Sequence, residues 1–251
     1  MTIETEQQFN AMKEIGAIVA NCLAFLKSIA KPGMTTLELD DAAGKFLAKE
    51  GAESAPKTVY NFPGHTCISV ERDAAHGIPG ERALQVGDLI NIDVSAHKNG
   101  YFADNGESFI IGKGSKSKTK LCRAVKQALN EAIAAAQADQ LISNVGRAVE
   151  SYASSQKMTV IRNLGGHGVG RSLHETPKFI PSFYDKKDQR VFTANQVVAI
   201  EPFLSNGGVE VDQAEDGWTL YLDHHYAAQK EHTIMITKHQ PVIFTQQTKH
   251  Y

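Results

Sequence analysis

The chain has 251 residues, of which 42% are hydrophobic and 22% are charged. This composition suffices for one large domain or two small ones with a substantial core. The formal net charge of −2 provides no basic field for nucleic acid, and the lysine-rich run 113–120 is interpreted as a solvated turn before a helix. We expect no membrane span, because no apolar stretch approaches ~20 residues, and the acidic, polar start is unlike a signal or transit peptide.

Three cysteines, Cys22, Cys67 and Cys122, stand apart and form no Cys-x-x-Cys pair. Isolated cysteines in odd number argue against a disulfide framework and against a zinc ribbon. We therefore expect a reducing, cytoplasmic location.

The first half is predicted to contain two helices followed by strands. Apolar residues recur at helical spacing over 6–30, and Lys31-Pro32-Gly33 ends that helix. A capping-box sequence, Thr35 to Glu38, begins a second helix that ends near Gly51. Strands are predicted at 66–70, 89–94 and 108–111.

The same order then begins again. Helices are predicted over 120–141 and 143–156, followed by apolar strands at 158–161, 197–200 and 233–236. No low-complexity linker separates the two halves, which run roughly over 1–115 and 116–251. The order predicts a single pseudo-symmetric α+β domain over 1–251, whose halves share one sheet and one core.

Asp93 lies inside an apolar strand, where an ionised side chain is costly unless it is paired or bound to metal. Downstream, Asn99-Gly100 is the strongest short hairpin signal. With these two residues at the centre of the turn, 95 faces 104 and 93 faces 106, so Asp93 and Asp104 are diagonal neighbours on one face. Diagonal neighbours lie roughly 7–8 Å apart, and carboxylates close that span around a metal pair ~3.5–4 Å apart. The alternative is a surface hairpin with two solvated acids.

His167 lies in the glycine-rich segment 165–170, and His174 follows it. The segment lacks the Lys-Ser/Thr of a phosphate loop, and Pro177 stands where a His-Glu-x-x-His helix would continue. A histidine flanked by glycines is typical of a backbone that passes close to an ion or a substrate. The alternative is a hydrogen-bonded core or surface imidazole.

Glu201 and Glu231 border apolar strands, where the alternative for each is a strand-end charge in water. Together with Asp93, Asp104 and His167 they form an oxygen-rich set, which favours Mn, Fe, Co or Zn over a structural zinc held by thiolates. Four carboxylates repel one another unless cations are present. The set therefore predicts a metal site in which two ions hold and activate a water.

Six segments resemble, in order and spacing, those of type I methionine aminopeptidases, and the resemblance runs from the first helix to about Thr237. The segments are Ala75–Pro79, Asn91–Ser95, Tyr101–Asp104, Gly166–Glu175, Ile200–Phe203 and Glu231–Ile234. The resemblance implies the pita-bread fold: two pseudo-symmetric halves around a dinuclear site, with a central antiparallel sheet flanked by helices.

The resemblance also implies a role for each residue of the set. Asp93 and Asp104 would be carboxylate ligands, with Asp104 bridging both ions. His167 would bind one ion. Glu201 would be a ligand on the same side and the acid/base that handles the proton of the bridging water. Glu231 would bridge the pair.

Further residues are implied to contact the substrate. His76 and His174 would hydrogen-bond the scissile peptide and stabilise the tetrahedral intermediate without binding metal. An apolar, aromatic pocket would hold the methionine thioether, which packs well on ring edges. Its positions are Tyr60, Phe62, Cys67, Leu173 and Trp218. Ordinary core packing is the alternative for these five.

The sequence departs from the family at several points. Asn105-Gly106 follows Asp104, where many members have Thr followed by Ser or Gly. That Thr supports the metal ligands, so the metal affinity and choice stay open here. Leu173 replaces a Phe of some members, and the His-rich stretch 221–226 has no assigned role. The zinc-finger extension of some eukaryotic members and the helical insertion of type II enzymes are absent, which indicates a compact bacterial-type or organelle-type enzyme.

The resemblance predicts removal of the initiator methionine from new proteins with a small second residue, with two divalent ions as cofactors. The expected partners are peptides and nascent chains with N-terminal methionine, and association with the ribosome is expected too. Neither nucleic acid nor a membrane is required. A monomer is expected, since no exposed apolar stripe demands a partner. One rival is an Xaa-Pro peptidase, a prolidase or aminopeptidase P, although these usually carry an extra N-terminal domain. The other is a metal-free binding protein of the same fold, although such relatives have lost ligands.

Overall fold

The structure is a computed structural model that describes residues 1–249 and 251. The helices are α1 (Glu6–Ile29), α2 (Thr36–Lys49), α3 (Ala55–Tyr60), α4 (Lys116–Ala135) and α5 (Ser143–Ser155). The first-half strands are β1 (Glu53–Ser54), β2 (Cys67–Val70), β3 (Asp73–Ala75), β4 (Leu89–Lys98) and β5 (Tyr101–Ile110). Those of the second half are β6 (Thr159–Val160), β7 (Gly165–Gly168), β8 (Glu175–Pro181), β9 (Val197–Ile200), β10 (Phe203–Ser205), β11 (Asp212–Gln213), β12 (Leu220–Tyr221), β13 (Ala227–Gln229), β14 (His232–Met235) and β15 (Val242–Ile243).

The four predicted helices are present, with three differences. α4 ends at Ala135, whereas a helix reaching residue 141 was predicted. The capping box at Thr35 is confirmed, because its hydroxyl accepts from the backbone N–H of Glu38. α4 begins earlier than predicted, since Ser115 caps it and draws the lysines from Lys116 onward into helix rather than turn. The short helix α3 was not predicted. Its six residues are too few to show helical periodicity.

Helix α1 corrects the expectation that no apolar stretch of the chain approaches the length of a membrane span. By length and composition alone it passes the test for a membrane-spanning helix, with a mean hydropathy of 1.3 over an 18-residue window. It is a core helix of the fold, because its buried side chains, such as Met12, Ile15 and Leu26, join the apolar cluster formed with β4. Its outward side carries exposed charges such as Lys13 and Glu14.

The hairpin β4–β5 has the predicted register. Ser95 pairs with Asp104 and Asp93 pairs with Gly106. Both turn residues have positive φ, 53° at Asn99 and 76° at Gly100, as a two-residue type I′ turn requires. Asp93 and Asp104 therefore share one face of the sheet, diagonally placed.

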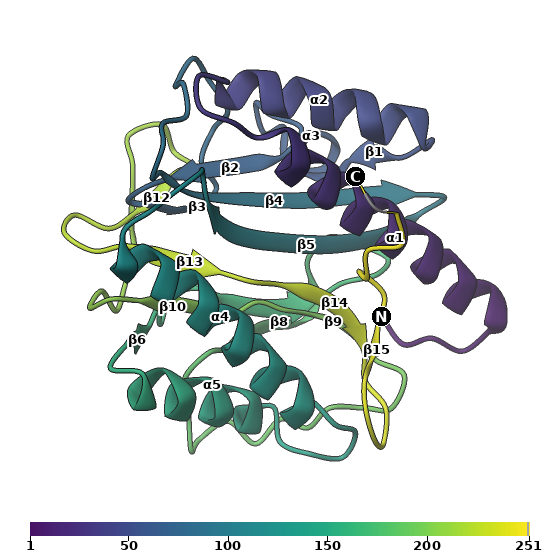
Figure 1. Cartoon of the computed structure of the whole chain (residues 1–251). Helices are drawn as coiled ribbons and strands as arrows, with labels where there is room; N and C mark the ends of the chain where they lie inside the picture. Colours follow the sequence, from purple (N-terminus) through teal and green to yellow (C-terminus); the bar gives the residue numbers. More distant parts are fainter. Residues whose placement is uncertain (250) are drawn as a thin grey trace.

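The α+β class and the two halves flanked by helices are confirmed (Figure 1). The antiparallel strands do not form the one continuous sheet that was expected. The first half contributes a four-stranded sheet of β1, β2, β4 and β5, and the second a five-stranded sheet in the order β15-β14-β9-β7-β8. Two three-stranded sheets, β13-β10-β6 and β11-β12-β3, complete the described part of the chain.

The two large sheets meet where β5 approaches β14, and β5 also contacts β13 of a three-stranded sheet. Side chains replace a main-chain ladder at this seam. The backbone N–H of Asp104 donates to Thr233 Oγ1 at 2.9 Å, and that hydroxyl donates to the Asp104 carbonyl at 2.8 Å. A single bridge, between Glu107 and Lys230, adds main-chain pairing. Side-chain hydrogen bonds and one bridge thus take the place of a continuous ladder at this seam.

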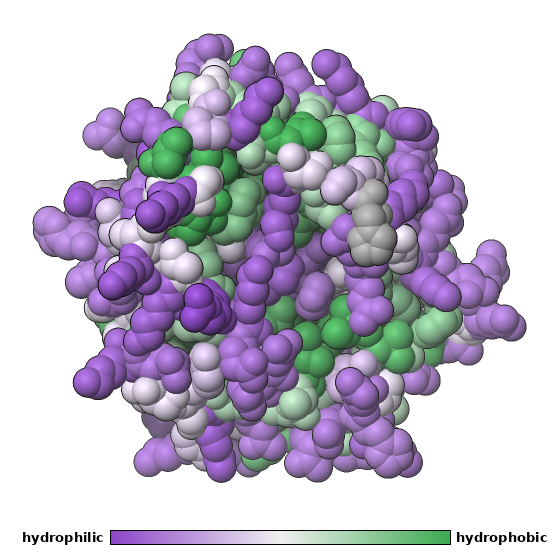
Figure 2. All heavy atoms as spheres, viewed as in Figure 1, coloured by the Kyte–Doolittle hydropathy of each residue, from purple (hydrophilic) through white to green (hydrophobic). Residues whose placement is uncertain are grey.

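The core consists of three clusters. One joins α1 and α2 to the first sheet and includes residues of β9 and β14, another joins α4 and α5 to the second sheet, and a small third one includes Phe203 and Leu222. In Figure 1 the sheets lie between these two helix pairs. Hydrophilic side chains predominate on the face seen in Figure 2, with hydrophobic ones in small patches between them.

Candidate active site

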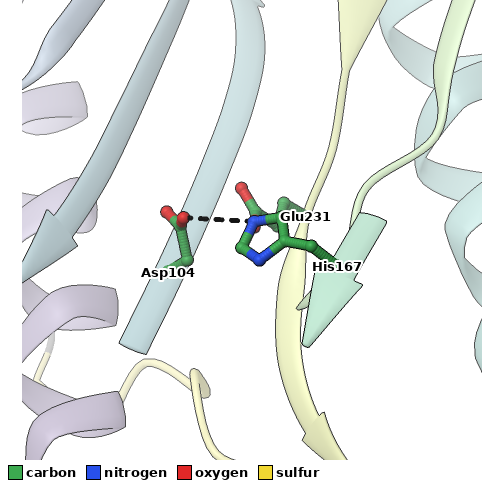
Figure 3. A group of neighbouring side chains, drawn as sticks. All are labelled: Asp104, His167 and Glu231. Carbon is green, nitrogen blue, oxygen red and sulfur yellow. Dashed lines mark ion pairs between the residues drawn. The ribbon is translucent and has the colours of Figure 1, made fainter. Parts of the chain in front are cut away.

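The five predicted ligand residues converge on the seam between the sheets. Asp93 lies on β4, Asp104 on β5 and His167 on β7. Glu201 directly follows β9, and Glu231 lies between β13 and β14. Figure 3 shows Asp104, His167 and Glu231 pointing toward one another from β5, from β7 and from the segment between β13 and β14. One ligand atom of each lies within 4.8 Å of the others.

His167 presents one ring nitrogen to the carboxylates. Its Nε2 lies 3.8 Å from Asp104 Oδ2 and 3.6 Å from Glu201 Oε1. Its Nδ1 lies 3.0 Å from the carbonyl of Gly168, a partner to which only a protonated Nδ1 can donate. Burial, and then the neighbouring His174, lowers the pKa of His167 to about 3, so its ring is neutral. Neutral imidazole with a free Nε2 is the form that binds metals.

The four carboxylates are destabilised as anions. Burial raises the pKa of Asp93, and raises those of Asp104, Glu201 and Glu231 well above their usual range, with repulsion among the acids adding to the last three. Three oxygens of these four carboxylates are buried without a hydrogen-bond partner in the described chain: Asp93 Oδ1, Asp104 Oδ1 and Glu231 Oε1. Such orphaned atoms are rare in native proteins. Divalent cations would satisfy all three and remove the repulsion, so the residues fit a metal centre.

Gln229 supports this centre and was missed by the sequence reasoning. Its Nε2 donates to Glu231 Oε2 at 3.0 Å and lies 3.5 Å from Glu201 Oε2. Its Oε1 accepts from Asn91 Nδ2 at 2.9 Å, which fixes the orientation of the amide. The available signal was its position two residues before Glu231, on the same side of an extended chain.

Gly106 makes room for this amide. A Cβ at position 106 would lie 2.1 Å from Gln229 Oε1. Strand alternation places Gly106 and Asp104 on the side of the metal ligands. Asn105 points the opposite way and lines a different cavity, toward α1. The departure from the family at position 105 therefore lies on the face of β5 opposite to Asp104.

A cavity of about 260 Å³ opens above the carboxylates. All seven predicted substrate-contacting residues line it, together with four of the five predicted ligands. These are Tyr60, Phe62, Cys67, His76, Leu173, His174, Trp218, Asp93, Asp104, His167 and Glu201. Glu231 lies behind this surface and reaches the centre from the seam. Pro56 and Ser95, which were not predicted, also line the cavity.

Aromatic rings form one wall of the cavity. Phe62 and Trp218 meet edge to face with ring centroids 5.2 Å apart. The Tyr60 hydroxyl lies 2.7 Å from His174 Nδ1. The imidazoles of His167 and His174 lie 4.1 Å apart between centroids, so His174 sits directly beside the candidate ligand. Burial, and then His76, lowers the pKa of His174 to about 4.

A carboxylate-rich centre with one imidazole, at the base of a partly apolar cavity, is the arrangement of a metal-dependent hydrolase. Residues 10–238 match metallopeptidase family M24. The chain belongs to this family, and it is a hydrolase that acts on peptide bonds.

Relatives cover nearly the whole chain. A methionine aminopeptidase of Staphylococcus epidermidis is 44% identical over 247 residues, which are 98% of each chain. Methionine aminopeptidase 2 of Bacillus subtilis is also 44% identical, over 98% of this chain and 99% of its own. The crystal structure of a methionine aminopeptidase from Thermotoga maritima superposes with a TM-score of 0.94 at 31% identity, covering 98% of this chain and 100% of that one.

The fold extends to more distant peptidases. An Xaa-Pro dipeptidase from Bacillus anthracis matches with a TM-score of 0.77 at 18% identity. The match covers 99% of this chain but only 63% of that protein. At this identity the likeness concerns the fold alone.

Proposed function

We propose that this chain is a methionine aminopeptidase that removes the initiator methionine from nascent proteins whose second residue is small. The observation that carries the proposal is the cavity itself, in which the apolar residues Phe62, Cys67 and Leu173 adjoin the carboxylate centre. The full-length relatives named methionine aminopeptidase support the same substrate.

Two divalent ions would be held by Asp93, Asp104, His167, Glu201 and Glu231. When bound, such ions supply Lewis acidity and lower the pKa of a coordinated water. Glu201 is the residue proposed to take the proton of that water, because its Oε1 faces the centre beside His167 Nε2 at 3.6 Å. Gln229 Nε2 donates a hydrogen bond to Glu231 Oε2, and thereby orients that carboxylate toward the ions.

His76 and His174 are proposed to act on the substrate without binding metal. Both line the cavity at its solvent side. The Tyr60 hydroxyl, when it donates to His174 Nδ1, leaves the Nε2–H of His174 free to donate. A donor in this place would hydrogen-bond the scissile peptide and stabilise the oxyanion that develops on its carbonyl.

Specificity for methionine is proposed to rest on the aromatic wall. A thioether is polarisable and packs favourably against aromatic rings, and the rings of Phe62 and Trp218 line the cavity. We further propose that the chain is one catalytic domain over 1–251, acts in the cytoplasm as a monomer and meets its substrates at the ribosome. The metal identity is left open among Co, Mn, Fe and Zn.

A peptide assay tests the substrate. Metal-loaded protein is incubated with Met-Ala-Ser and with Ala-Pro-type peptides, and the free amino acids are measured. We expect methionine release from the first peptide alone, because the cavity accepts a long apolar side chain. Cleavage that depends on proline would instead indicate an Xaa-Pro peptidase. An absence of turnover with each of the divalent metals would indicate a binding protein.

A further inference from the structure

A second cavity, of about 290 Å³, lies behind the metal centre. It is lined by Lys27 on α1, by Asn105 and Glu107 on β5, and by Lys230 and His232 on either side of Glu231. Strand alternation explains this arrangement. Residues 104 and 231 turn toward the metal centre, so their neighbours turn to the reverse side and form the cavity.

The cavity carries excess positive charge. Glu107 Oε2 pairs with Lys27 Nζ at 2.7 Å and with Lys230 Nζ at 3.0 Å, and its Oε1 pairs with Lys126 Nζ at 2.7 Å. Lys126 lies outside the lining, so within the cavity one carboxylate faces the two ammonium groups of Lys27 and Lys230. Each ammonium has three N–H donors, and in the described chain Lys230 Nζ bonds to Glu107 alone. The Lys230 side chain is only 14% exposed. Its ammonium group therefore keeps N–H donors for a further acceptor.

Asn105 adds an independent sign of a missing partner. The residue is 3% exposed, and its Oδ1 is buried without a hydrogen-bond partner among residues 1–249 and 251. Buried amides are satisfied in nearly all native structures. The oxygen and nitrogen of an amide exchange places on rotation, so the Asn105 Nδ2 can take the position of the orphaned Oδ1. In that orientation Asn105 offers a donor to the cavity instead of an acceptor.

We propose that this cavity is a binding site for a small oxyanion, a carboxylate or a tetrahedral phosphate-like group, held by Lys27, Lys230 and the amide of Asn105. An oxyanion accepts several N–H bonds at once and neutralises the excess charge, which no neutral ligand does. The site lies on the opposite face of β5 from Asp104, so it is separate from the peptide-binding cavity and does not depend on the substrate proposed above.

Isothermal titration of the metal-loaded enzyme with sodium sulfate and with inorganic phosphate tests the site, against sodium chloride at matched ionic strength. We expect saturable binding of one oxyanion per chain. Lys27→Met removes one donor and Asn105→Asp places a negative charge in the cavity, so each is expected to weaken binding about 10-fold or more, as loss of a charged hydrogen bond does. Lys113→Met, on an exposed lysine, is the matched control.

Two results would overturn the proposal. One is an absence of saturable binding, which would mean that water fills the cavity. The other is unchanged binding in both variants, which would place the ion at the metal centre or elsewhere. Should Lys27→Met fold poorly, Asn105→Asp decides the question, because it keeps the ion pairs of Glu107 and nearly the same side-chain volume. Lys27→Arg, which keeps the charge, is expected to retain binding.

Discussion

The carboxamide of Gln229 connects the two halves of the site through single hydrogen bonds. It accepts from Asn91 on β4 and donates to Glu231 in the second half. Gln229 is fully buried. A supporting residue of this kind holds a ligand in place without touching the ion, and removing one typically costs 10–100-fold in metal affinity.

Replacing this amide should therefore weaken the metal centre. For Gln229→Met, which keeps the length of the side chain and loses the donor, we expect the affinity for divalent metal to fall about 10–100-fold. Calorimetric titration with Mn²⁺ or Co²⁺ measures this metal affinity. Gln127→Met, at an exposed position of α4, is the control. Equal affinities in the two variants would show that Gln229 does not support the ligands.

His76 should separate catalysis from metal binding. The residue lines the cavity on the solvent side and is not among the buried residues that could hold a metal ion. We expect His76→Ala to keep its bound metal and to lose about 10²–10³-fold in turnover, the effect of losing one oxyanion donor. Metal analysis and methionine release are measured on the same sample. A variant that loses metal together with activity would disprove the proposed role.

At the scale of elements, the hairpin β4–β5 decides whether Asp93 and Asp104 cooperate. A slip of one residue in its register would turn one of the two side chains to the other face. The turn secures the register, because Asn99 and Gly100 both adopt positive φ. Asn tolerates this backbone conformation and Gly adopts it without strain.

Gly100→Ala tests the turn. Its φ of 76° strains any residue with a Cβ, so we expect the free energy of unfolding to fall by about 1 kcal/mol. Gly80→Ala is the matched control, since nothing lies within 4 Å of its Cβ position and its φ is not in the left-handed region. Urea denaturation compares the two. A loss of stability in Gly80→Ala as large as that in Gly100→Ala would refute the explanation.

At the scale of the whole molecule, Glu107 joins parts of the chain that are distant in sequence. Its partners Lys27, Lys126 and Lys230 come from α1, from α4 and from the seam before β14. Burial by itself raises the pKa of Glu107, but the surrounding lysines, Lys230 foremost, outweigh it and hold the pKa well below its usual range. A carboxyl group whose pKa is lower in the folded state stabilises the fold above its unfolded pKa, and this contribution is lost as the pH falls.

Glu107→Gln should consequently destabilise the protein in a pH-dependent way. At pH 7 we expect a loss of about 3 kcal/mol, since the largely buried ammonium group of Lys230 loses its counter-ion. The difference from the unmodified protein should shrink as the pH falls below the usual value of 4.5 for a glutamate, because the native carboxylate then also loses its advantage. Denaturation in urea with EDTA present measures the loss of stability at pH 7 and its decrease below pH 4. A difference independent of pH would contradict the ion-pair explanation.

Much of the fold and site could be predicted because the signals are local. Helical periodicity, the capping box at Thr35 and the Asn-Gly turn each act over a few residues, and the turn alone set Asp93 beside Asp104. Gln229 and α3 were missed for the opposite reason. A lone glutamine and a six-residue helix have no pattern of their own, and their roles depend on contacts with distant segments.

The sequence by itself determined the identity of the acids and the histidine, the pairing of the first two acids, and the resemblance to a peptidase family. The tertiary structure alone decided that β7, β9 and the segment before β14 bring His167, Glu201 and Glu231 to the same seam. It also decided that a second cavity lies against the face that Asn105 and Glu107 occupy. The physical reason is that strand alternation fixes the face of each residue locally, whereas the packing of two sheets decides what lies opposite that face.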